Sequence, residues 1–81
     1  MVKKGDRVGA IQSSDKDIVK FFGYGVYVGD TIPPNFPILN PTINLDNGQV
    51  VYGYECWWGS EARVKEIIGD RKVIEVLPDR R

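Results

Sequence analysis

The tightest constraint on the fold is a hairpin signal in the second half of the chain. Asp46-Asn47-Gly48 lies between two stretches, 42–45 and 49–55, in which apolar and polar residues alternate. Asn-Gly readily adopts the positive φ angles of a tight turn that reverses the chain between two antiparallel strands. We therefore predict a β-hairpin here, and the fold has to be built around it.

Alternating or β-branched stretches elsewhere in the chain indicate further strands. We expect these strands at 7–12, 18–22, 23–30 and 71–76. The segment 31–41, TIPPNFPILNP, contains four of the five prolines and is expected to form an ordered loop, because proline cannot donate a hydrogen bond to a strand ladder. From 50 to 58 the alternation continues, so this stretch is predicted to be one strand.

One helix is predicted, at 61–68. Ser60 is a suitable N-cap, Glu61 suits the positive end of the helix dipole, and apolar residues follow at helical spacing before Gly69. Five or six short antiparallel strands with one late helix favour a mainly β fold, namely a small SH3-like β-barrel with the helix at one end. A small open α+β sheet, with the helix on one face, is the alternative.

Length and charge narrow the classes of function. A chain of 81 residues has room for one hydrophobic core, so we expect a single domain over 1–81. Eleven basic residues balance eleven acidic ones, and the zero net charge argues against a nucleic-acid partner. Because no stretch approaches the about 20 apolar residues of a membrane span or reads as a secretory signal, we expect no membrane association and a cytoplasmic location.

The residues needed for common catalytic chemistry are scarce. The chain has no histidine, which is the usual base for activating a nucleophile and the commonest metal ligand. Cys56 is the only cysteine and cannot complete a zinc site, so we expect an inert core thiol. The glycine-rich stretch 23–29 lacks the spacing, the following helix and the lysine of a phosphate loop. We therefore expect no enzyme activity, no metal and no cofactor.

Strand parity divides the aromatic stretch 50–58 into two faces. One face is almost wholly apolar and is assigned to the core: Val50, Tyr52, Tyr54, Cys56 and Trp58. The other face has Val51, Gly53, Glu55 and Trp57, and 23–30 offers a matching face in Gly25, Tyr27 and Gly29. If these faces adjoin, they form a floor of glycines walled by aromatic rings, with one carboxylate directed into it.

Such a surface suits stacking of a planar or cationic group. The predicted ligand-binding residues are Tyr27, Tyr52, Glu55, Trp57, Gly25 and Gly53, and Tyr52 would join the others only at a groove edge or a subunit interface. The alternative is that Trp57 packs on the helix or on the proline-rich loop while Glu55 pairs with a basic residue.

The chain resembles a family of small bacterial and phage proteins. The resemblance rests on GDRVGAIQSSDKD near the start, FGYGVYVGD in the middle and NPTINLDNGQVVYGYECWWGSE near the end, together about half of the chain. It implies no activity and no functional residue that can be transferred to this chain.

Two functions fit these features. The first is a non-catalytic binding protein, such as a phage-type accessory protein, that holds a small planar or nucleotide-derived ligand. The second is an SH3-like protein-interaction module, in which an aromatic groove takes an extended peptide or an edge strand pairs with a partner or a second copy of the chain. The expected partner is therefore a small molecule, another protein, or the same chain in a homo-oligomer.

Overall fold

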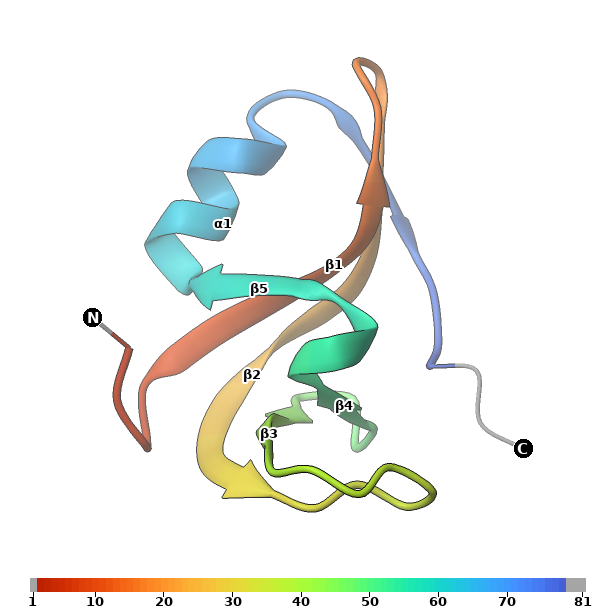
Figure 1. Cartoon of the computed structure of the whole chain (residues 1–81). Coiled ribbons are helices and arrows are strands. Elements are labelled where there is room, and N and C mark those ends of the chain that lie inside the picture. The colour runs from red at the N-terminus through yellow and green to blue at the C-terminus, as the bar shows by residue number, and fades with distance from the viewer. Residues whose placement is uncertain (1, 79–81) are drawn as a thin grey trace.

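The computed structural model describes residues 2–78 and contains one six-stranded sheet with an α-helix (Figure 1). In chain order the elements are β1 (Arg7–Ser14), β2 (Ile18–Thr31), β3 (Asn40–Leu45), β4 (Val50–Tyr52), the 3-10 turn η1 (Gly53–Glu55), β5 (Trp57–Ser60), α1 (Glu61–Ile68) and β6 (Lys72–Glu75). The prediction of a mainly β fold with one short helix is confirmed.

The sheet is open and follows the order β4-β3-β2-β1-β5, with β6 paired to β2 outside this path. All neighbouring strands on the path are antiparallel, whereas β6 runs parallel to β2. No ladder joins the edge strands β4 and β5 within residues 2–78, so the sheet does not close. The architecture is thus the predicted alternative, an open sheet, and not a closed barrel.

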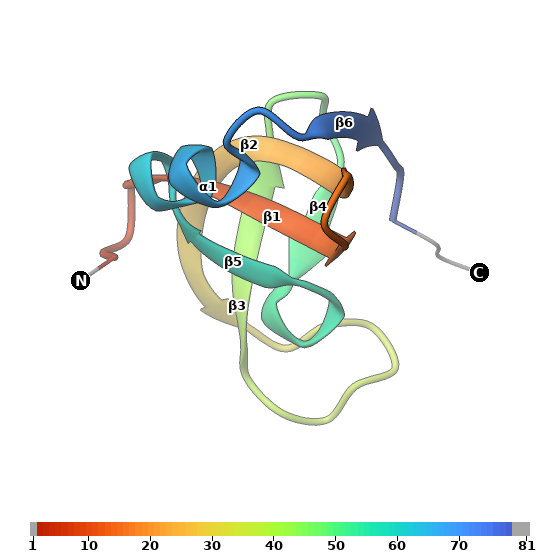
Figure 2. The ribbon, with the colours of Figure 1, turned by 90° about the horizontal axis from the view of Figure 1, so that it is seen from above.

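The prediction of two strands at 18–22 and 23–30 is wrong, because β2 is one continuous strand of 14 residues. Gly23 and Gly29 have φ angles of +135° and +102°, and they bend the strand without ending it. The pairing of β2 with its neighbours shifts register close to both glycines. Figure 2 shows the resulting curve of β2, whose first half pairs with β6 and whose second half pairs with β3.

The prediction of one strand over 50–58 is also wrong, because η1 interrupts it. The Glu55 carboxylate accepts the Tyr52 N–H at 3.0 Å, and the Asn40 side-chain oxygen accepts the Tyr54 N–H at 2.9 Å. Gly53 lies against the Pro41 ring, which would be 2.9 Å from a Cβ atom at this position. These contacts favour a tight turn, and strand parity therefore does not relate the residues before η1 to those after it.

The local predictions at the hairpin and the helix are confirmed. Gly48 has a φ of +90° in the turn between β3 and β4. Ser60 caps α1 by accepting the Arg63 N–H at 3.1 Å, and Gly69 follows the last helical residue. The proline-rich segment forms a loop over 32–39, which is shorter than predicted, because Thr31 ends β2 and Asn40 and Pro41 begin β3. No helix within residues 2–78 is long and apolar enough to cross a membrane.

The core consists of two clusters. The first contains Val8, Ala10, Phe22, Ile43, Leu45 and Val51, and Cys56 and Trp58 pack against it as predicted. The second lies between the sheet and α1 and contains Ile11, Val19, Phe21 and Val64. The assignment of Tyr54 to the core is wrong, because η1 turns its side chain outward and leaves it 48% exposed. The faces predicted for β4 are also reversed: Val51, expected on the opposite face, is fully buried, whereas Val50 and Tyr52 are only partly buried.

Candidate functional site

The two predicted site residues on β2, Gly25 and Tyr27, make contacts within the fold. Gly25 is buried, and a Cβ atom there would lie 2.2 Å from the carbonyl oxygen of Asn44, so this glycine allows β2 and β3 to approach closely. The Tyr27 ring lies 5.1 Å from the Trp58 ring, between centroids, and its hydroxyl donates to Asp30 at 2.6 Å. The hydrogen bond to Asp30 is the main reason that the pKa of Tyr27 is raised.

Three further predicted residues, Tyr52, Gly53 and Glu55, lie together at η1, where an unpredicted set of stacked rings is also found. The Tyr54 ring is nearly parallel to the Phe36 ring, with 4.3 Å between centroids and an angle of 3°. On its other side lies the Tyr52 ring, with 6.3 Å between the ring centroids and an angle of 11° between the ring planes. We call Phe36, Tyr52 and Tyr54 the aromatic ridge. The proline-rich loop contributes Phe36 and so packs on the turn that replaced the predicted strand.

Trp57 lies in a different place, at the start of β5, where it pairs with Ile11 of β1. Its side chain is 47% exposed and lines a pocket of about 300 Å³. The other lining residues are Ile11, Gln12, Ser13, Ser14 and Ile67. We call this the Trp57 pocket. Its lining residues come from the end of β1, the start of β5 and the last turn of α1.

The glycine beside this indole is Gly59, two residues further along the same strand. A Cβ atom at Gly59 would lie 3.0 Å from the Trp57 ring, so the ring rests against bare backbone. Trp57 therefore does lie beside a glycine, as predicted, but this glycine is Gly59 and not Gly25 or Gly53. The two-residue period of β5 was the signal that could have identified it.

The six predicted residues thus do not form one continuous wall. Tyr52, Gly53 and Glu55 lie at η1, Tyr27 faces Trp58, Gly25 is buried under β3, and Trp57 lines its own pocket. Sequence reasoning missed the polar residues of the Trp57 pocket, Gln12, Ser13 and Ser14, because they were assigned to a strand end and a turn.

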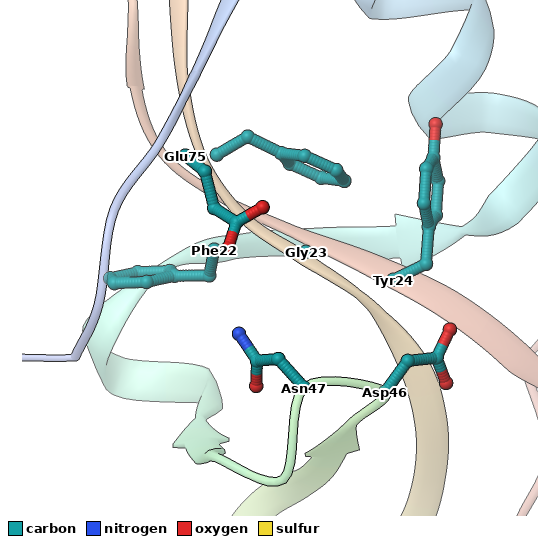
Figure 3. Close-up of a pocket in the computed structure, with 7 residues that line it drawn as sticks. Phe22, Gly23, Tyr24, Asp46, Asn47 and Glu75 are labelled. Atoms are coloured by element: carbon teal, nitrogen blue, oxygen red, sulfur yellow. The ribbon is translucent and has the colours of Figure 1, made fainter.

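A second, smaller pocket of about 190 Å³ lies beside β2 in the region between β6 and the β3–β4 turn (Figure 3). Figure 3 shows the Asn47 amide and the Glu75 carboxylate directed toward the same space. The fold already uses much of its lining: Phe21 and Phe22 are buried in the core, and both oxygens of Asp46 bind Arg7 at 2.7 Å. This pocket therefore offers a ligand less free surface than the Trp57 pocket does.

The one thiol is poorly suited to nucleophilic chemistry. Burial, together with the charge of Glu55, raises the pKa of Cys56 to about 12. The thiol donates to the Tyr52 carbonyl oxygen at 3.5 Å and stays protonated at neutral pH. Within the part of the chain that the structure describes, no three histidine, cysteine or acidic residues are grouped so that they could hold a metal ion.

Comparison with known proteins adds no relative from which a function could be transferred. No family model, curated protein or solved structure matches the chain. Function therefore has to be inferred from the geometry of the described residues.

Proposed function

We propose that the protein is a non-catalytic binding protein that holds a small planar ligand in the Trp57 pocket. The observation that supports this most is the half-exposed indole of Trp57 lining a pocket of about 300 Å³. Known small-molecule sites begin at about this volume and combine apolar walls with a few polar groups. A nucleotide-derived ring system fits this size.

The pocket combines groups that could bind both the face and the edge of a heterocycle. Stacking of a base on an aromatic side chain contributes about 1–3 kcal/mol. Ile11 and Ile67 supply apolar surface next to Trp57, while the hydroxyls of Ser13 and Ser14 can donate and accept hydrogen bonds. The Gln12 amide adds a second donor and acceptor pair.

Several features favour binding over catalysis. The Cys56 thiol is protonated at neutral pH, and the chain has no histidine to activate Ser13 or Ser14. The zero net charge also disfavours a long phosphate backbone as the ligand. A small phage-type accessory protein working in the cytoplasm is part of this proposal.

Tryptophan fluorescence tests the proposal directly. We expect at least one member of a panel of nucleobases, nucleosides, nucleotides and cyclic nucleotides to quench the emission and raise the melting temperature. Trp57→Leu should abolish the quenching, whereas Trp58, which packs on Tyr27, still emits. Tyr54→Leu is the matched control, because it removes an equally exposed aromatic ring from the aromatic ridge and should leave binding intact. If the whole panel caused neither quenching nor a thermal shift, the proposal would fail.

A second candidate function is a protein-interaction module that uses the aromatic ridge. The specific observation is the stack of three nearly parallel rings, with Tyr54 48% exposed in its middle. The adjoining loop also exposes Ile32, Ile38 and Leu39. Aromatic grooves bind extended, proline-containing peptides. A peptide-array screen in which binding is lost with Tyr54→Ala and kept with Trp57→Leu would favour this function; the opposite pattern would exclude it.

A further inference from the structure

The polar part of the Trp57 pocket carries no charge. Its polar side-chain groups are the Gln12 amide and the hydroxyls of Ser13 and Ser14, and the other lining residues are apolar or aromatic. The described residues of the lining thus include neither a basic side chain for a phosphate nor an acidic one for an ammonium group. A charged group placed against such a wall loses hydration without gaining an opposite charge, which is unfavourable.

The backbone at the end of β1 adds further uncharged groups. β5 begins with Trp57 opposite Ile11, whereas β1 continues to Ser14, so residues 12–14 have no described strand on that side. Because peptide groups along a strand alternate between its two edges, at least one of these residues directs its N–H and C=O to the open side. Such a donor and acceptor pair, like the Gln12 amide, is complementary to the edge of a nucleobase.

The charged groups closest to the pocket are used by the fold. Ile67 belongs to the last turn of α1, where the helix dipole gives a partial negative charge. The Arg71 guanidinium offsets this charge, because it donates to two carbonyl oxygens of that turn and to that of Asp15. The Asp15 carboxylate accepts two backbone N–H groups of its own turn, each at 2.8 Å. Lys20 lies opposite Ser13 in the β1–β2 register but does not line the pocket.

We propose, on the basis of the function proposed above, that the Trp57 pocket selects an uncharged ligand, a free nucleobase or a nucleoside, over the corresponding nucleotide. The ring stacks on the Trp57 indole, and its edge exchanges hydrogen bonds with the Gln12 amide and the open backbone at 12–14. A phosphate on the ligand meets no basic residue of the lining and stays in solvent, so it adds nothing to the affinity.

Fluorescence titrations with the four common ribonucleosides and their 5′-monophosphates, each at low and high salt, test this. We expect the nucleoside that quenches to bind at least as tightly as its monophosphate. Its Kd should change less than about twofold with salt, because no ion pair is there to be screened. Gln12→Leu should weaken its binding at least about fivefold, since a bidentate amide contact is lost. Gln49→Leu, the same change at an exposed position in another turn, is the matched control and should bind normally.

Ser14→Lys supplies the missing charge at the pocket. In this variant the monophosphate should bind several-fold tighter than the nucleoside, and high salt should remove the difference. An unchanged preference in Ser14→Lys, or unchanged affinity in Gln12→Leu, would overturn the inference.

The titrations also separate this inference from the proposed function. If a monophosphate bound the unsubstituted protein several-fold tighter than its nucleoside, and high salt weakened it, the inference would be overturned while the proposed function would stand. If no nucleobase, nucleoside or nucleotide quenched the emission, both would fail together.

Discussion

Arg7 binds Asp46 through two parallel hydrogen bonds of 2.7 Å, one from each terminal guanidinium nitrogen to each carboxylate oxygen. The pair joins the first residue of β1 to the turn between β3 and β4. One of the same nitrogens lies 3.4 Å from a carboxylate oxygen of Glu61, at the first residue of α1. A single guanidinium therefore connects the sheet, the hairpin and the helix.

This pair predicts how stability depends on pH. The hydrogen bonds from Arg7 lower the pKa of Asp46, and N–H donation from Asp17 and Ile18 lowers that of Asp15. Since both folded-state pKa values lie below those of the unfolded chain, the unfolded chain takes up protons first as pH falls. The stabilisation is complete above the unfolded-state pKa of about 4 and is lost as pH falls through the folded-state values.

Urea unfolding at a series of pH values checks this. We expect Asp46→Asn to lower the urea concentration at the unfolding midpoint at neutral pH. As the pH is lowered, this midpoint should decrease less in the variant than in the unsubstituted protein. The effect should be modest, because the pair is exposed to solvent. Parallel pH curves for the two proteins would show that the Arg7–Asp46 pair contributes nothing to acid sensitivity.

Cys56 should resist thiol reagents in the folded protein. Its pKa of about 12 leaves very little thiolate at pH 8, and the side chain is only partly accessible. We expect labelling to be slow in buffer and rapid in denaturant. Lys16→Cys, which introduces a thiol in an exposed turn, should be labelled at once under the same conditions. Rapid labelling of Cys56 in the native state would contradict the assignment of an inert core thiol.

Gly25→Ala should be strongly destabilising. The new Cβ atom would meet the backbone of Asn44 at 2.2 Å, and a paired strand cannot move aside easily. Overpacking of this kind costs about 1–3 kcal/mol, occasionally more. Gly9→Ala is the comparison: its Cβ atom would lie 3.0–3.1 Å from side-chain atoms of Val64 and Tyr24, which can adjust. Equal losses in the free energy of unfolding would argue against the close approach of β2 and β3.

Arg71→Met should destabilise the junction between α1 and β6. The guanidinium donates to two carbonyl oxygens at the end of α1, Ile67 and Ile68, and to that of Asp15 in the β1–β2 turn. Losing hydrogen bonds from a charged donor should reduce the free energy of unfolding by about 1.5–3 kcal/mol. Lys72→Met, at an exposed neighbouring position, serves as the control and should change it little. Similar effects of the two substitutions would contradict the role given to Arg71.

The parts of the fold that could be predicted from sequence are those set by local signals. Asn47-Gly48 marked the hairpin, and Ser60 and Gly69 marked both ends of the helix. The turn η1 was not predicted, because the alternation of apolar and polar residues continues through Gly53 without a break. Its formation depends on Asn40 and Pro41, which are more than ten positions earlier in the chain and become neighbours only after the hairpin closes.

The candidate site was only partly predictable for the same reason. Trp57 was identified by its residue type, but its surroundings depend on the pairing of β5 with β1 and on the packing of α1. No local sequence pattern indicates either of these long-range contacts. The parity argument required an unbroken strand, so it grouped Trp57 with Glu55 and Gly53 instead of with Ser13 and Ser14.

An NMR titration of the ¹⁵N-labelled protein tests the central claim, a planar ligand in the Trp57 pocket, most directly. The titrant is the nucleobase or nucleotide of the panel that gives the strongest quenching. We predict that the Trp57 indole N–H signal and the amide signals of Gln12, Ser13, Ser14 and Ile67 shift together and saturate, while those of Phe36 and Tyr54 stay in place. Shifts confined to the aromatic ridge, or no saturable shift at Trp57, would contradict the account.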